Sequence, residues 1–140
     1  MKAPGGADVK AFSVSFNIPT AFNWTNRSQT VNVVRAQPLT IAWTGAAATT
    51  SMAVIGVSVD LPANASAIFY CVAPPNVNSF TVPADMLSVL PPTHGDPLKS
   101  KSVIFLANSP PSNATPVNIP GINAALAEPT LILGKTVVFQ

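Results

Sequence analysis

Turn-forming residues recur along the whole chain and restrict its fold more than any other feature. The 140 residues include 15 prolines, 7 glycines, 11 asparagines and 24 serines and threonines. Proline and glycine interrupt helices, asparagine favours turns, and threonine suits strands. Residues that favour helices are scarce, and Glu128 is the only glutamate. The composition therefore predicts an all-β protein.

Charged residues are few, which excludes several classes of function. Lysine, arginine, aspartate and glutamate make up 9% of the chain, against about 25% in a typical soluble domain. The net charge is only +2 and the seven cations are dispersed, so we expect no nucleic-acid binding, which needs clustered cations. Proline, glycine and asparagine break every long uncharged stretch, so we also expect no membrane insertion.

Short segments of alternating apolar and polar residues predict the strands. The clearest are Val9–Ile18, which Pro19 ends, and Leu39–Thr44, which stops at Gly45. Residues 52–59 are almost continuously apolar, as in a strand covered on both faces. The other expected strands cover residues 30–35, 68–72, 80–82, 102–107, 117–119 and part of 130–139.

The spacing of these strands predicts the architecture. We expect a two-sheet, Ig-like sandwich of about seven to nine short antiparallel strands, with one short helix near residues 83–90. Residues 1–8 contain two adjacent glycines and no periodicity, which indicates a flexible arm or linker. Residues 9–140 then form a single β-sandwich domain, a length that suffices for an ordinary core.

An ordered set of short motifs resembles a module that recurs in uncharacterised secreted proteins of soil bacteria. The matching segments are Trp24–Arg27, Val33–Arg35, Leu39–Gly45, Val54–Ser58, Phe69–Pro74, Ser79–Pro83, Leu87–Pro91 and Val137–Gln140. The resemblance covers roughly residues 10–140 and departs from the family pattern at Tyr70 and in the stretch 110–120. It implies an Ig-like sandwich and export, and it implies no reaction.

The residues that catalysis requires are missing or scattered. His94 is the only histidine and lies in a loop rich in proline and glycine, where we expect it to be solvated. Cys71 is the only cysteine and is expected to pack as a small apolar residue in a strand. The acidic residues are isolated in the sequence: Asp8, Asp60, Asp85, Asp96 and Glu128. We therefore expect no enzyme, no cofactor and no metal site.

The shortage of charge favours a structural or adhesive module that contacts copies of itself or neighbouring extracellular domains. Lysine on edge strands normally prevents strands of different molecules from pairing, and the predicted strands contain almost none. The first predicted strand, behind its loose arm, suits addition to another subunit, as in a filament. The residues of this candidate assembly strand are Val9, Phe12, Val14, Phe16 and Ile18.

The alternative is a carbohydrate-binding module that uses exposed aromatic residues. Trp24 is followed by Asn26 and Arg27, and an exposed ring beside amides can stack on a sugar of a polysaccharide. Trp24 can equally close one end of the sandwich. Either function places the protein outside the cell or at its surface, although residues 1–6 show no signal peptide.

Overall fold

The computed structural model describes residues 1–94, 100–109 and 114–140, and its elements are almost all strands. Strands account for 43% of the residues and helix for 4%, which confirms the all-β, sandwich-like prediction with one short helix. The contacts divide the chain into two compact units. Unit 1 comprises Met1–Pro19 and Pro110–Thr130, and unit 2 comprises Thr20–Ser109 and Leu131–Gln140. This division differs from the expected single domain over residues 9–140.

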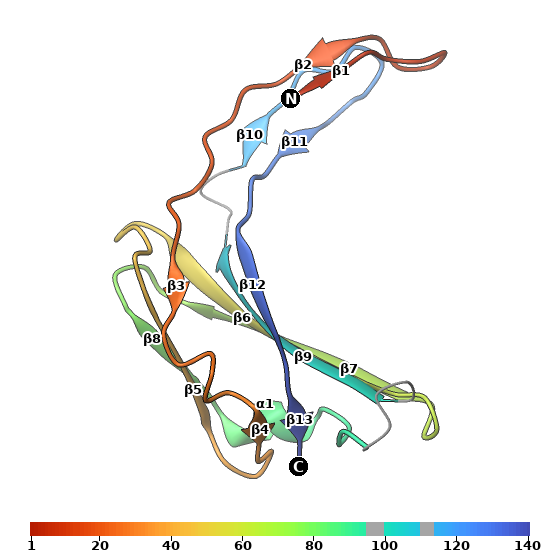
Figure 1. Cartoon of the computed structure of the whole chain (residues 1–140). Coiled ribbons are helices and arrows are strands. Elements are labelled where there is room, and N and C mark those ends of the chain that lie inside the picture. The colour runs from red at the N-terminus through yellow and green to blue at the C-terminus, as the bar shows by residue number, and fades with distance from the viewer. Residues whose placement is uncertain (95–99, 110–113) are drawn as a thin grey trace. The chain divides into compact units, whose positions relative to one another are not determined.

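Unit 2 is built from two sheets and one additional strand pair (Figure 1). The four-stranded sheet has the order β12-β9-β6-β7, with β6 at Ser51–Asp60, β7 at Ala65–Ala73, β9 at Ser100–Ser109 and β12 at Ile132–Thr136. The second sheet has the order β3-β5-β8, with β3 at Asn23–Trp24, β5 at Leu39–Thr44 and β8 at Ser79–Val82. β4 (Asn32–Val33) pairs in parallel with β13 (Val138–Phe139).

Most of the predicted elements of unit 2 are present. The apolar run at residues 52–59 lies within β6, and the alternating segment Leu39–Thr44 coincides with β5. Helix α1 spans Ala84–Ser88, after Pro83 and with Asp85 in its first turn, as its sequence predicts. The strand expected over residues 30–35 is shorter, because only Asn32–Val33 pairs.

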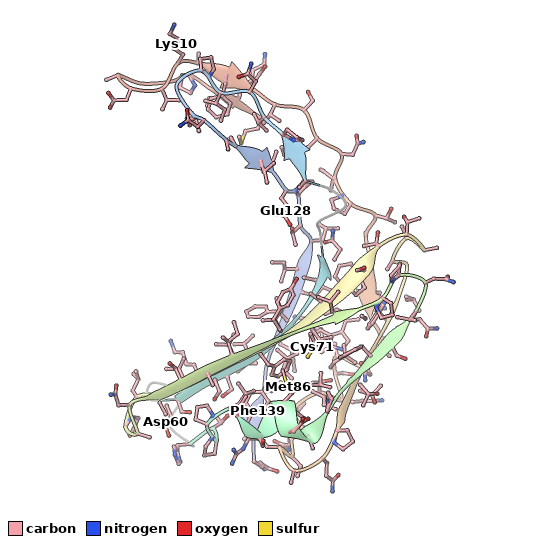
Figure 2. All side chains as sticks on the ribbon, turned by 180° about the vertical axis from the view of Figure 1, so that it is seen from behind. Lys10, Asp60, Cys71, Met86, Glu128 and Phe139 are labelled. Atoms are coloured by element: carbon pink, nitrogen blue, oxygen red, sulfur yellow. The ribbon has the colours of Figure 1, made fainter. Side chains whose placement is uncertain are left out.

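The core of unit 2 lies between its sheets and against the helix. Trp43 and Ile41 on β5 alternate with solvent-facing threonines, while Val54 on β6 and Leu106 on β9 are its counterparts on the other sheet. Figure 2 shows Met86 of the helix and Phe139 of β13 close together at one end of this unit. The remaining large buried apolar residues are Trp24, Val33, Met52, Phe69, Val82, Leu87, Leu90, Ile104 and Val137.

A tight turn joins the long strand β6 to the edge strand β7. The backbone N–H of Asn64 donates to the carbonyl of Leu61 at 3.0 Å, and Asn64 has a positive φ of 48°. Asparagine tolerates this left-handed conformation better than other non-glycine residues. The turn fixes a register in which all nine residues of β7 face residues of β6.

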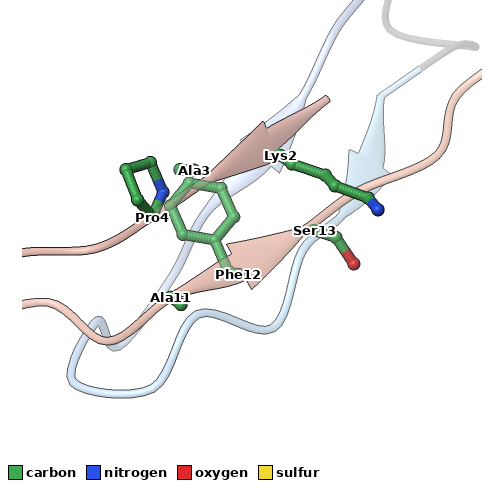
Figure 3. A pocket seen from close by; sticks show the side chains of 6 residues that line it. All are labelled: Lys2, Ala3, Pro4, Ala11, Phe12 and Ser13. Carbon is green, nitrogen blue, oxygen red and sulfur yellow. The ribbon is translucent and has the colours of Figure 1, made fainter.

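Unit 1 contains two small hairpins. β1 (Lys2–Ala3) pairs with β2 (Phe12–Ser13), and β10 (Thr115–Pro116) pairs with β11 (Leu126–Ala127). Residues 1–8 therefore take part in a hairpin instead of forming a free arm, and no strand forms at residues 117–119. The Phe12 ring lines a hollow of this hairpin with Pro4 and Lys2 (Figure 3).

Candidate interaction surface

The outer side of the four-stranded sheet is apolar. The register places Ile55 of β6 between Tyr70 of β7 and Phe105 of β9, and it places Val57 between Ile68 and Val103. Side chains alternate between the two faces of a strand, so these residues all lie on the side opposite the core residues Val54 and Leu106. We call the following residues the open face: Ile55, Val57, Val59, Ile68, Tyr70, Val72, Val103, Phe105 and Ile132.

Solvent reaches this open face. Ile68, Tyr70 and Val72 of β7 are 64%, 54% and 47% exposed, and Ile132 of β12 is 56% exposed. The central residues, such as Val57 and Val103, are half-buried between their neighbours. Scattered single apolar residues on a surface are ordinary, but a continuous patch across four strands marks an interaction site.

The outer side of the smaller sheet is polar by contrast. Thr40 of β5 and Thr81 of β8 face each other there, and their hydroxyl oxygens lie 2.9 Å apart. Thr44 and Ser79 are also exposed on these strands. The two outer sides of the sandwich in unit 2 therefore differ: one is polar and suited to water, and the other is apolar and suited to contact with another surface.

The two edges of the four-stranded sheet also differ. On β12, Lys135 supplies a charge, and the guanidinium Nη2 of Arg27 donates a hydrogen bond to the carbonyl oxygen of Gly134. The opposite edge strand, β7, has the sequence ASAIFYCVA and contains neither charge nor proline. Charge and proline are common protections against pairing at an edge, so β12 is protected and β7 is open.

Trp24 does not serve as an exposed aromatic platform. It is 3% exposed, because β3 places it opposite Trp43 of β5 in the core. Its indole Nε1 donates to the Oδ1 of Asn26 at 2.9 Å. The expectation of an exposed Trp24 that stacks on sugars is therefore wrong, because its side chain is buried in the core.

Asn26 and Arg27 act within the fold. The Asn26 side chain accepts a hydrogen bond from the Ala42 N–H at 3.0 Å and donates to the Thr40 carbonyl at 2.8 Å, so it extends the ladder of β5. Arg27 is exposed and lines a shallow hollow with Ser28 and Lys135, beside the edge of Trp24. Trp24, Asn26 and Arg27 each make a hydrogen bond within the fold, and Arg27 is the most exposed of the three.

The candidate assembly strand Val9–Ile18 lies in unit 1 and is mostly not a strand. Only Phe12–Ser13 pairs, and hydrogen bonds between Met1 and Val14 extend that pairing by one position. Phe16 and Ile18 are 39% and 75% exposed, while Val9, Phe12 and Val14 are half-buried. A strand needs a neighbour for its backbone groups, and past Val14 the described residues provide none up to Pro19.

The structure brings together polar residues that are distant in the sequence. The Nε2 of His94 lies 2.8 Å from the Oδ2 of Asp60, and the backbone N–H of His94 donates to Ser100 Oγ at 3.2 Å. The Asp60 side chain is 1% exposed and that of His94 is 58% exposed. Figure 2 shows Asp60 at the end of its strand. Asp60 is isolated from the other acids in the sequence, but the fold places it beside His94, whereas Asp96 lies outside the described residues.

A hydroxyl network continues from this end of the sheet into the core. Ser58 and Ser102 face each other with their oxygens 2.8 Å apart, and Thr93 Oγ1 lies 2.6 Å from Ser102 Oγ. Ser58 also donates to the Pro91 carbonyl at 2.8 Å, and Thr93 Oγ1 accepts from the N–H of Phe139 at 2.9 Å. The Ser58–Ser102 bond links β6 to β9, and the bonds to Pro91 and Thr93 connect these strands and β13 to the segment after the helix, so the network has a structural role.

Sequence reasoning missed this end of the sheet, although the sequence carried a signal for it. Met52, Val54, Gly56, Ser58 and Asp60 occupy every second position of one strand. The alternation that buries Met52 and Val54 therefore also turns Ser58 and Asp60 inward. A polar residue in the inward phase of a strand requires polar partners, and they come from Ser102 and His94.

The comparisons with known proteins supply no relative for this chain. No family model matches it, and neither the curated proteins nor the solved structures contain a match. Within residues 1–94, 100–109 and 114–140, no group of three or more metal-binding side chains occurs. In that same part of the chain, no helix is long and apolar enough to cross a membrane.

Proposed function

We propose that this chain is a non-catalytic, extracellular structural and adhesive module that associates with copies of itself. The observation that carries the proposal is the open face, an apolar surface that extends over all four strands of one sheet. An extracellular setting is consistent with the low charge and with the motif resemblance of the sequence.

A second copy of the chain is the occupant that suits the open face best. An isologous contact places the same patch on both partners, so it needs a surface without repulsion against itself. The open face meets this requirement, because its nine residues are uncharged and Lys101 lies at its border, at the end of β9 opposite Val59. Two flat apolar sheets can then pack face to face at about 10 Å, as in ordinary sandwiches.

The size of the open face is also adequate. Strands β6 and β9 have 10 residues, β7 has 9 and β12 has 5, so at about 3.3 Å per residue and about 4.8 Å between strands the face covers roughly 540 Å² for each partner. The total of about 1,100 Å² lies close to the lower limit of about 1,000 Å² for a specific interface. We therefore expect a concentration-dependent association rather than an obligate dimer.

Mass measurement of the whole chain tests this function. Sedimentation of the wild type across a concentration series should show particles heavier than one chain. Val57→Lys places a charge in the centre of the open face and should lower the mean mass, because a buried unpaired charge is costly. Thr81→Lys, on the polar side of the other sheet, is the matched control and should behave as the wild type. Circular dichroism checks that each variant is folded.

Two results would contradict the proposal. A wild-type chain that stays monomeric up to about millimolar concentration, where even weak contacts with a Kd near 1 mM form, has no such function. Equal effects of Val57→Lys and Thr81→Lys would place the contact elsewhere on the molecule.

A further inference from the structure

We infer that two copies of the chain pair along β7, antiparallel, and join their four-stranded sheets into one continuous eight-stranded sheet. This contact uses the backbone edge of β7, whereas the face-to-face packing above uses side chains of the open face. Because edge pairing is one form of the proposed self-association, it rests on that function and specifies the partner as the β7 strand of a second copy.

The first argument is the contrast between the two edges of the sheet. A strand at an edge presents a row of N–H and C=O groups that water or another strand must satisfy. Arg27 and Lys135 protect β12, as described above. β7 has nine residues without charge or proline, and β6 is its one paired neighbour among the strands of the described residues.

The second argument is the length and composition of β7. Strands in globular proteins most often have about five or six residues, and edges are usually kept short. β7 exceeds this length, and its residues Ile68, Phe69, Tyr70 and Val72 are of the β-branched and aromatic types that favour strands. A long edge of this composition is a template for pairing.

The third argument is continuity of the open face. In an antiparallel pair, side chains on one face of a strand lie beside those on the same face of its neighbour. Ile68, Tyr70 and Val72 are more exposed than the residues of the central strands, because β7 has a neighbour on one side only. A second β7 would cover their flanks with identical side chains.

The register follows from maximal overlap of the two strands. Two antiparallel nine-residue strands pair over their whole length when their middle residues face each other, and the middle residue of Ala65–Ala73 is Phe69. The two-fold axis then passes near Phe69. Ile68 of one copy faces Tyr70 of the other, and Ser66 faces Val72.

Distances between spin labels test this register. Each single cysteine replaces Ser66, Ile68, Tyr70 or Val72 in a Cys71→Ser chain that also carries Val57→Lys, which removes the face-to-face contact. Each further residue between the label and the two-fold axis should increase the distance between the two labels of a dimer by about 7 Å along the strand. Two labels at position 68, one on each copy, should therefore lie near each other, as should two labels at position 70. Two labels at position 66, or two at position 72, should be about 20 Å apart.

The outcomes separate edge pairing from the proposed function. A distance between the two labels that is shortest at positions 68 and 70 and longer at positions 66 and 72 supports the antiparallel pairing. Equal distances at all four positions would indicate parallel pairing and overturn the inference, as would a monomeric labelled chain when the wild type associates. In those two cases the proposed self-association still stands, whereas a monomeric wild type removes both.

An edge-protecting variant gives a second test. Ala67→Lys places a charge on the inward side of β7, a device by which natural sheets prevent edge pairing. We expect that the short distance between two labels at position 68, and between two labels at position 70, is lost while circular dichroism still shows the folded sheet. Short distances that persist in Ala67→Lys would contradict pairing along β7.

Discussion

Asp60 shows how a buried acid is tolerated in a chain with few charges. Its carboxylate is 1% exposed, with the His94 imidazole at 2.8 Å and the Ala63 N–H at 3.4 Å. Removing the imidazole leaves the carboxylate buried with fewer partners, which is costly. Because the His94 side chain is 58% exposed, water can replace part of the lost contact, and the effect is moderate.

We expect His94→Ala to lower the free energy of unfolding by about 1 kcal/mol. Asp60→Asn keeps the volume and removes the charge, so adding His94→Ala to it should cost clearly less than His94→Ala costs alone. Urea unfolding of the four proteins of this double-mutant cycle measures the coupling. Additive effects of the two substitutions would show that the side chains do not interact.

Cys71 is half-buried in β7, and desolvation by burial raises the pKa of its thiol above the ordinary value of 9.0. The thiolate is therefore disfavoured in the folded protein relative to the unfolded chain. The stabilisation is fully present below the pKa of the unfolded thiol and is lost as the pH rises through the folded pKa. Alkaline conditions should thus weaken the fold.

The rate at which Cys71 reacts with a disulfide reagent should rise with pH to a midpoint above that of the unfolded chain in urea. The unfolding free energy should also fall more steeply above pH 9.0, the ordinary pKa, than it does in Cys71→Ser. Identical midpoints for folded and unfolded thiols would contradict the burial effect, whatever the difference in absolute rate.

Between β6 and β7, Gly56 leaves the space that the Phe69 ring occupies. An added Cβ at Gly56 would overlap Cε1 and Cζ of Phe69, a residue that is 2% exposed. The ring has no space into which it can move, because interiors are closely packed. Phe69 thus lies over Gly56 as a key element of the contact between these two strands.

We expect Gly56→Ala to lower the free energy of unfolding by about 2–3 kcal/mol, the cost of overpacking. Gly134→Ala is the matched control, since its Cβ would meet the half-exposed Phe105 ring at 3.0 Å and that ring can shift. The control should cost less than about 1 kcal/mol. Denaturant unfolding compares the two variants. Adding Phe69→Leu to Gly56→Ala should restore part of the lost stability, whereas Phe69→Leu in the wild type should not increase its stability.

The strands differ in how far the sequence predicts them. β5 is predicted to the residue because Leu39, Ile41 and Trp43 alternate and meet a core. The same alternation at Phe16 and Ile18 gives no strand, because no neighbour is present among the described residues. Local pattern establishes which face a strand can bury, whereas pairing depends on contacts distant in the sequence.

The candidate site follows the same rule. The low charge predicts a contact surface, and the apolar run of β6 predicts that both of its faces tend to be covered. The position of the open face requires the strand order, which places Val57 between Ile68 and Val103. The burial of Trp24 likewise depends on its pairing with Trp43, which single-sequence reasoning cannot supply.

At the scale of the whole molecule, the two proposed self-complementary surfaces on one chain would together determine how assembly proceeds. The open face and the β7 edge would each form an isologous contact, and each contact alone would stop at a dimer. Alternation of the two contacts links copies into larger particles, either closed with two-fold axes or extended as a filament. Which surfaces are intact therefore decides the size of the assembly.

We expect the wild type to form particles larger than dimers at high concentration, since both surfaces are then occupied. Val57→Lys should leave dimers joined along β7, and Ala67→Lys should leave dimers joined through the open face. The double variant should be monomeric, and Thr81→Lys should resemble the wild type. Light scattering with size separation distinguishes these masses. A Val57→Lys chain that gives only monomers would contradict pairing along β7, and an Ala67→Lys chain that gives only monomers would contradict association through the open face alone.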